Sequence, residues 1–281
     1  MTYSWFKIKP FSTTVGEKYD AQKDVDLMML CEKIPDVLFA VFNLPKSRFT
    51  LCLRVPSNAG MMVRSIRSFG VESCDLPVVT KINALVQLKL AKNSVYPLGD
   101  KLAISNIFSV ITNAPYGVFV IKLYHTDSKP IISKYEKLAQ KSKTSDTVHL
   151  DPHISKAKQK SECTLFFRCN MFFGVQNISD IKAFQSIIPY ASEHIEPNRL
   201  VPAKIILSKA KNLDAATDHL KKIVTTQSNH KNMILSNQDI LTFVRFPQNP
   251  EHLGLEPATF PTMASDSFDE RFFDLSNPSE L

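Results

Sequence analysis

Hydrophobic residues in this chain repeat at two spacings, one typical of strands and one typical of helices. The segment 37–44 is almost entirely apolar, whereas 48–55 has a hydrophobic residue at every second position. The first pattern is typical of a buried strand and the second of a strand with one buried face, so together they predict a hairpin. By the same criteria, further strands are predicted at 84–90, 118–123, 163–175 and 200–207.

Between these strands, apolar residues fall three or four positions apart, which predicts amphipathic helices. One helix is expected to begin with Ser57 or Asn58 as its cap and to end at Gly70. Another is expected after Ser236, which with Asp239 resembles a capping pair. Further helices are predicted at 100–114, 132–138, 179–195 and 213–223.

The alternation of strands and helices predicts an α/β (α+β) fold of tandem ferredoxin-like βαβ units with mixed sheets. The strand–helix–strand order shared by 84–123 and 163–207 favours this interpretation. The chain is then expected to divide into an N-terminal extension (1–33), a first α/β subdomain (34–128), a lysine-rich linker or helix (129–161), a second α/β subdomain (162–248) and an acidic extended tail (249–281).

Glycine is scarce, and its spacing excludes two common nucleotide-binding loops. The chain has seven glycines in 281 residues, and no two of them are closer than ten positions. A P-loop needs two glycines five positions apart, and a dinucleotide-binding turn needs three within six positions. The chain therefore has the signature of neither a P-loop nucleotidase nor a Rossmann dehydrogenase.

Membrane-spanning segments, signal peptides and cysteine usage indicate the compartment in which a protein is found. No apolar run approaches the ~20 residues that a membrane-spanning helix requires, and the first ten residues lack the design of a signal peptide. The five cysteines are scattered and odd in number, which favours free thiols in a reducing compartment. These features predict a cytoplasmic protein, with the inner face of the membrane as the alternative location.

The net charge of +7 is distributed unevenly along the chain. The segment 129–160 holds eight lysines and carries +5, the segment 203–231 carries +4, and the tail 249–281 carries −6. Solvated lysine-rich segments explain this distribution without a ligand, whereas a surface facing a polyanion is the functional alternative. For that alternative, the candidate nucleic-acid-binding residues are Lys141, Lys143, Lys156, Lys158, Lys160, Lys221 and Lys222.

Residue types that perform catalysis or bind metals are present, but their patterns support neither role. His149 and His153 have the helical spacing of zinc ligands, yet Pro152 argues against a regular helix there. Cys163 and Cys169 are too far apart in the sequence for a redox or zinc pair. We therefore predict no catalytic residue, no metal site, no cofactor and no small-molecule substrate.

A phenylalanine-rich strand leaves two interpretations open. Adjacent residues of a strand point to opposite faces, so adjacent aromatics favour a sheet that is buried on both faces. The alternative is an exposed sheet whose aromatics stack on single-stranded bases around Arg168. The adjacent pairs are Phe166 with Phe167 and Phe172 with Phe173.

Several longer segments carry a resemblance to a known family. They are SRFTLCLRVPSN (47–58), YPLGDKLAISNIFSVITNAPYGVFVIKLYH (96–125), CTLFFRCNMFFGVQNISDIKAFQSIIPY (163–190), NRLVPAKI (198–205) and ILSNQDILTFVRFPQN (234–249). In this order they resemble the region that precedes the motor domain in conjugation and type IV secretion ATPases of the HerA–FtsK superfamily, especially archaeal-type transfer ATPases. The P-loop that follows in that family is missing here, and Arg245 lies where a histidine is typical.

The resemblance implies a non-catalytic module rather than an ATP-hydrolysing one. We therefore expect a scaffold or adaptor that mediates assembly with a ring-forming ATPase or a secretion-channel protein. The alternative is direct binding of nucleic acid by the lysine clusters 129–160 and 204–231. DNA and a second copy of the chain are further partners that the sequence leaves open.

Overall fold

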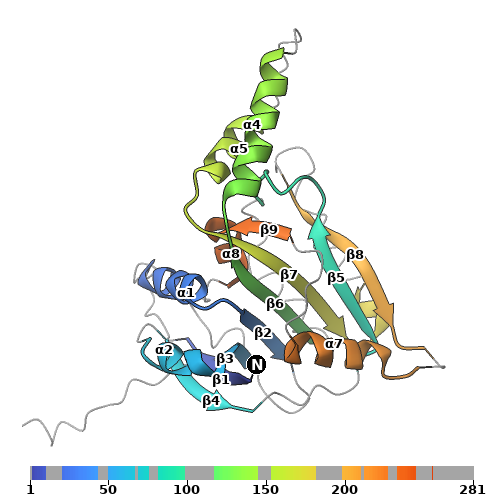
Figure 1. The fold of residues 1–281 in the computed structure, drawn as a ribbon. Coiled ribbons are helices and arrows are strands. Elements are labelled where there is room, and N and C mark those ends of the chain that lie inside the picture. Colours follow the sequence, from blue (N-terminus) through green and yellow to red (C-terminus); the bar gives the residue numbers. More distant parts are fainter. Residues whose placement is uncertain are drawn as a thin grey trace, which may run out of the picture.

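The computed structural model describes residues 2–10, 21–43, 50–66, 69–75, 82–98, 117–144, 153–181, 198–209, 212–226 and 233–244, together with Leu255. Within them, nine strands form one sheet (Figure 1). The order across the sheet is β4 (Gly70–Cys74), β1 (Tyr3–Lys9), β3 (Thr50–Pro56), β2 (Val37–Asn43), β6 (Gly117–Thr126), β7 (Phe166–Val175), β5 (Ala84–Leu90) and β8 (Leu200–Leu207). The ninth strand, β9 (Met233–Ser236), pairs with the first half of β7.

The first four strands form a ferredoxin-like unit, called unit 1 below. Helix α1 (Ala21–Lys33) connects β1 to β2, and β2 and β3 form the predicted hairpin. A 3₁₀ turn (Ser57–Ala59) and α2 (Gly60–Arg64) then lead to β4. The resulting sheet order, β4–β1–β3–β2, is that of a split βαβ unit, in which each crossover passes over an intervening strand.

The next four strands repeat this order as β8–β5–β7–β6 and form unit 2. A shift of eighty positions relates the first two strands of the units, since Trp5 and Leu38 occupy the places that Leu85 and Val118 occupy in unit 2. The second strands of the two units, β2 and β6, pair edge to edge and antiparallel. The two units therefore form one continuous sheet around a pseudo-twofold axis.

The predicted α+β fold class is confirmed, but one detail of the prediction was wrong. The sheet is not mixed, because every described pairing is antiparallel. In a split βαβ unit the two parallel strands are separated by an antiparallel one, so they never pair. A larger repeat relates 3–74 to 84–207, and the predicted pair of segments, 84–123 and 163–207, contributes the first two and the last two strands of unit 2.

All predicted strands are present, and the predicted helices differ only in part. The helix expected from Ser57 to Gly70 ends at Arg64, and Gly70 instead opens β4. The helices expected at 132–138 and 213–223 correspond to α4 (Lys129–Thr144) and α7 (Ala215–Thr225), and α8 (Asn237–Val244) begins directly after Ser236 of the predicted capping pair. The segments 100–114, most of 179–195, and the tail except Leu255 lie outside the described residues.

Helices cover both faces of this sheet. One face packs against α1, α2 and α8 in the larger hydrophobic core. The opposite face is covered by α7, which buries a stripe at helical spacing formed by Ala216, Leu220, Ile223 and Val224. Ferredoxin-like units carry their crossover helices on one face, so α7 closes the face that such a sheet would otherwise expose.

The lysine-rich segment is largely helical and projects from the end of the sheet (Figure 1). Here α4 and α5 (Ile154–Ser161) pack together between β6 and β7, where unit 1 has only the connection from β2 to β3. We call this pair of helices the arm. Its base is held by a small core of Val95, Ile131, Ala157 and Phe166.

Candidate interaction surfaces

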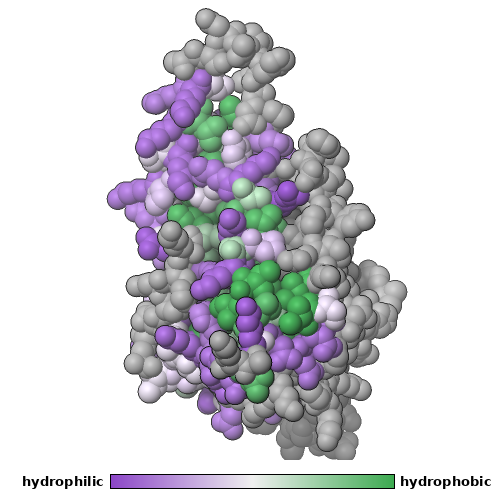
Figure 2. Space-filling view, turned by 90° about the vertical axis from the view of Figure 1, so that its right-hand side faces the viewer, coloured by the Kyte–Doolittle hydropathy of each residue, from purple (hydrophilic) through white to green (hydrophobic). Residues whose placement is uncertain are grey.

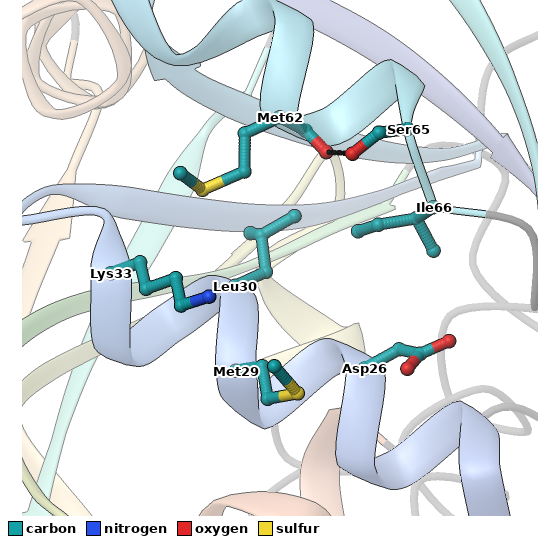
Figure 3. Close-up of a pocket in the computed structure, with 7 residues that line it drawn as sticks. All are labelled: Asp26, Met29, Leu30, Lys33, Met62, Ser65 and Ile66. Carbon is teal, nitrogen blue, oxygen red and sulfur yellow. Dashed lines mark hydrogen bonds between the residues drawn. The ribbon is translucent and has the colours of Figure 1, made fainter.

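A hollow between α1 and α2, the α1–α2 groove, has a volume of about 310 Å³. Figure 3 shows Leu30 of α1 pointing toward α2, which carries Met62, with Met29 beside it and Asp26 and Lys33 on either side along α1. The turn after α2 is fixed by the Ser65 hydroxyl, which donates to the Met62 carbonyl at 2.8 Å. The lining residues are Asp26, Met29, Leu30, Lys33, Met62, Ser65 and Ile66.

Large apolar side chains are exposed in and beside this groove. Met29 is 44% exposed, Met62 39%, Met61 77% and Val25 48%. Exposed apolar residues scattered singly are normal, whereas a group of them marks an interaction site. Methionine is flexible and polarisable, so a surface rich in it adapts to different apolar partners. The α1–α2 groove therefore has the chemistry of a protein-docking surface.

The sequence analysis missed this groove, although one signal could have found it. Four of the eight methionines occur as two adjacent pairs, Met28–Met29 and Met61–Met62. Neighbouring positions of a helix point in directions about 100° apart, so both members of a pair are rarely buried together. Met28 enters the core, while Met29, Met61 and Met62 remain exposed.

Five of the seven candidate nucleic-acid-binding lysines belong to the arm. Lys141 on α4 and Lys156 and Lys158 on α5 are exposed. Lys158 lies 3.8 Å from Glu162, an exposed pair of little energetic weight. Lys143 is in α4, but its side chain is outside the described part of the structure.

Lys160, the fifth of these lysines, points inward and not toward solvent. Its side chain is fully buried, and its Nζ lies 2.7 Å from Oδ2 of Asp239 and 3.2 Å from the carbonyl of Tyr96. Asp239 also accepts hydrogen bonds from the backbone N–H groups of Leu98 and Ser236, the latter confirming the predicted capping pair. Lys160 thus fastens α5 to α8, and its charge is not presented to a ligand in solvent.

The other two candidates, Lys221 and Lys222, are exposed residues of α7. Lys222 lines a hollow of about 540 Å³ between α7 and β8, the β8–α7 groove, to which Lys204 of β8 also contributes. Lys221 lies outside this lining, 3.9 Å from Asp218. The lining residues are Lys204, Ile205, Ile206, Asn212, Ala215, Asp218, His219 and Lys222.

A buried ionic cluster lies in unit 1, at the end of α7. Nη2 of Arg54 is 2.7 Å from Oδ1 of Asp36, and both side chains are completely buried. Nη1 of Arg54 donates to the carbonyl of Val224 at 2.7 Å, and the Tyr3 hydroxyl donates to Asp36 at 2.8 Å. Burial and this hydrogen bond to Asp36 raise the pKa of Tyr3 to about 12.

Lys122 of β6 adds a second buried cation to this cluster. Its Nζ donates to the carbonyl of Thr226, just beyond α7. Burial, and secondarily the charge of Arg54, lowers the pKa of Lys122 to about 8, while Asp36 opposes that shift. Arg54 and Lys122 therefore satisfy carbonyls at the C-terminal end of α7, where positive charge is favourable.

The remaining candidate chemistry is in the core or outside the described residues. Each phenylalanine of the β7 pairs is at most 2% exposed, so the packed-core interpretation is confirmed and the base-stacking one is wrong. His149 is not described, and His153 precedes α5. The described residues contain no group of three metal-ligating side chains, and none of their helices is long and apolar enough to cross a membrane.

No family model matches this chain, and no curated protein matches it significantly.

Proposed function

We propose that this chain is a non-catalytic scaffold or adaptor that mediates assembly with a ring-forming ATPase or a secretion-channel protein of a DNA-transfer system. The observation that carries the proposal is the set of exposed apolar residues beside the α1–α2 groove. They account for four of the eight large hydrophobic side chains that are exposed in the described residues. The resemblance to the region that precedes the motor in transfer ATPases indicates the class of partner.

The test is affinity capture of the full-length chain from the organism that makes it, with two variants. Met29→Glu combined with Met62→Glu places two charges in the groove, whereas Leu213→Glu changes a residue that is 71% exposed elsewhere. The parent and the Leu213 variant are expected to recover a ring-forming ATPase or a channel protein, and the groove variant to lose it. Recovery of neither class by the parent, or equal recovery by all three, would contradict the proposal.

A second candidate function, direct binding of nucleic acid, is favoured by the lysines of the arm and of α7. Lys141, Lys156 and Lys158 are exposed on two packed helices, and Lys222 lies near Lys204 of another element. Neutralised phosphates release counterions, so binding should weaken steeply as salt is raised. The direct measurement is the affinity of the full-length chain for DNA and RNA oligonucleotides over a range of salt concentrations.

A further inference from the structure

The β8–α7 groove combines positive charge with an apolar floor. One wall is β8, which is the edge strand of the sheet among the described strands. The other wall is α7, and the connection between them is closed by paired hydrogen bonds between the backbones of Lys209 and Asn212. Figure 2 looks onto the side of the molecule that carries β8 and shows apolar side chains bordered by hydrophilic ones.

The strand contributes a cation and an apolar residue to the same face. Ile206 lies opposite Leu85 and Lys204 opposite Gln87 in the pairing with β5. Leu85 belongs to the core that α7 covers, so residues two positions apart on β8 face α7 as well. The side chains of Lys204 and Ile206 are therefore directed to the α7 side of the sheet.

The helix contributes a second cation at the matching place. Ala215, His219 and Lys222 are spaced at i, i+4 and i+7, so they form one face of α7. This face is separate from the stripe that α7 buries against the sheet. Along the groove, a lysine on each wall thus borders a floor of small and branched aliphatic side chains.

The charge balance of the groove is positive. Asp218 is the carboxylate among its lining residues, and it lies 3.9 Å from Lys221, which is outside the lining. Lys204 and Lys222 remain as the cations of the groove, and both are exposed. Lysine ammonium groups attract phosphates as point charges without reading sequence.

We infer that the β8–α7 groove binds single-stranded nucleic acid, with Lys204 and Lys222 contacting the backbone phosphates and Ile206 lying under an unpaired base. This inference rests on the second candidate function and assigns it to one of the two lysine surfaces. An unpaired base has an exposed face that can rest on an apolar floor, whereas a base inside a duplex has both faces stacked. The groove therefore favours a single strand over a duplex.

The test measures fluorescence anisotropy of fluorescein-labelled oligo(dT), alone and annealed to oligo(dA), with the full-length chain. The groove variant combines Lys204→Glu with Lys222→Glu. The arm variant combines Lys156→Glu with Lys158→Glu. The α1–α2 variant combines Lys33→Glu with Arg64→Glu and makes the same change of charge on α1 and α2. All six residues are exposed, so each variant is expected to fold, which circular dichroism checks.

The groove variant is expected to bind oligo(dT) at least about tenfold more weakly than the parent at low salt. Its plot of log affinity against log salt should be flatter by about 1.4, since two lost contacts each contribute about 0.7 for a single strand. The arm and α1–α2 variants should change less, and the duplex should bind more weakly than the single strand.

The two proposals fail in different ways. If the parent binds oligo(dT) but only the arm variant loses affinity, nucleic-acid binding stands and its assignment to the groove is overturned. Equal losses in all three variants, or tighter binding of the duplex, also overturn the assignment. If the parent binds neither probe at low salt, both nucleic-acid binding and the groove assignment are overturned.

Discussion

Equivalent positions of units 1 and 2 hold an arginine and a glycine. Arg54 of β3 lies opposite Leu38 of β2, and Gly174 of β7 lies opposite Val118 of β6. In unit 1 the space above this position is filled by the Arg54 side chain, which reaches the end of α7. In unit 2 it is filled by Ile82, since a Cβ on Gly174 would lie only 2.9 Å from that side chain. Two units with one strand order thus pack their shared face differently, because α7 breaks their symmetry.

The two units also differ in what joins their second and third strands. Unit 1 connects β2 to β3 across 44–49, whereas unit 2 places the whole arm between β6 and β7. The paired strands are antiparallel in both units. Insertions at such connections add surface while leaving the sheet intact. The comparison therefore separates a shared framework from elements that only one unit has.

The largest effect is expected from breaking the buried pair of unit 1. Asp36→Ala leaves the Arg54 guanidinium buried without its counter-charge, which should lower the free energy of unfolding by about 3–5 kcal/mol. Glu72→Ala removes an exposed partner of Lys9 at 2.9 Å and should cost less than about 1 kcal/mol. Urea denaturation measures both, and equal losses would contradict the importance given to the buried pair.

The next largest loss of stability is expected from breaking the ion pair between Lys160 and Asp239, which attaches the arm to α8. Lys160→Met should lower the free energy of unfolding by roughly 2–3 kcal/mol, because it leaves the buried Asp239 carboxylate without its cation. Lys156→Met changes an exposed lysine on the same helix and should stay within about 0.5 kcal/mol of the parent. Denaturation curves that coincide for the two variants would show that Lys160 does not anchor the arm.

A substitution at Gly174 of unit 2 should cause a smaller loss of stability. Gly174→Ala forces its new Cβ against Ile82 and Val118, and we expect a cost of about 1–2 kcal/mol in the free energy of unfolding. Gly60→Ala is the matched control, since its Cβ would meet Phe6 at an ordinary 3.4 Å and the residue opens a helix. Thermal or urea unfolding measures the stability of both variants. An unchanged stability of Gly174→Ala would mean that Ile82 and Val118 move aside without cost.

Stability should also depend on pH through Lys122. Its pKa is lowered from 10.5 to about 8 in the folded protein, so between these pH values the unfolded chain holds more of this proton. Stability from this group therefore rises as the pH is raised from about 8 toward 10.5, and falls as the pH is lowered through 8.

Comparison with Lys122→Met isolates this contribution from that of other titrating groups. The free energy of unfolding of the parent minus that of the variant should increase between pH 8 and 10, as measured by urea denaturation. Lys89→Met, at an exposed position of β5, is the control for replacing a lysine by methionine on a strand. If this difference in the free energy of unfolding did not change with pH, the pKa of Lys122 would not be lowered by folding.

Much of the fold follows from local patterns, and particular residues show why. Alternation at 48–55 and 84–90 indicated strands, because the period of two is a property of a strand by itself. Ser236 and Asp239 indicated a helix start, because their hydrogen bonds span only three positions. Met62 and Phe69 show the limit, since their helical spacing did not yield one helix.

The candidate surfaces were predicted less well. The lysine-rich segments were found, yet Lys160 was counted with its exposed neighbours although it is buried. Lys204 was not singled out, although it shares a groove with Lys222. No local signal distinguishes Lys160 from its neighbours, because they share its charge and a similar polar sequence, whereas Lys204 lies in the apolar segment 200–207.

The sequence by itself determined six of the nine described strands, the pairs of adjacent buried phenylalanines and the uneven charge, since each depends on neighbours within a few positions. It did not yield β1, α1, β4 or β9. Only the tertiary structure decided that the strands form one antiparallel sheet and that α7 covers its second face. It also decided which charges are buried: Lys160 meets Asp239 across 79 positions, and Arg54 meets Val224 across 170. The physical reason is that hydrophobic periodicity acts along the chain, whereas the partner of a buried charge is set by chain segments that meet only after folding.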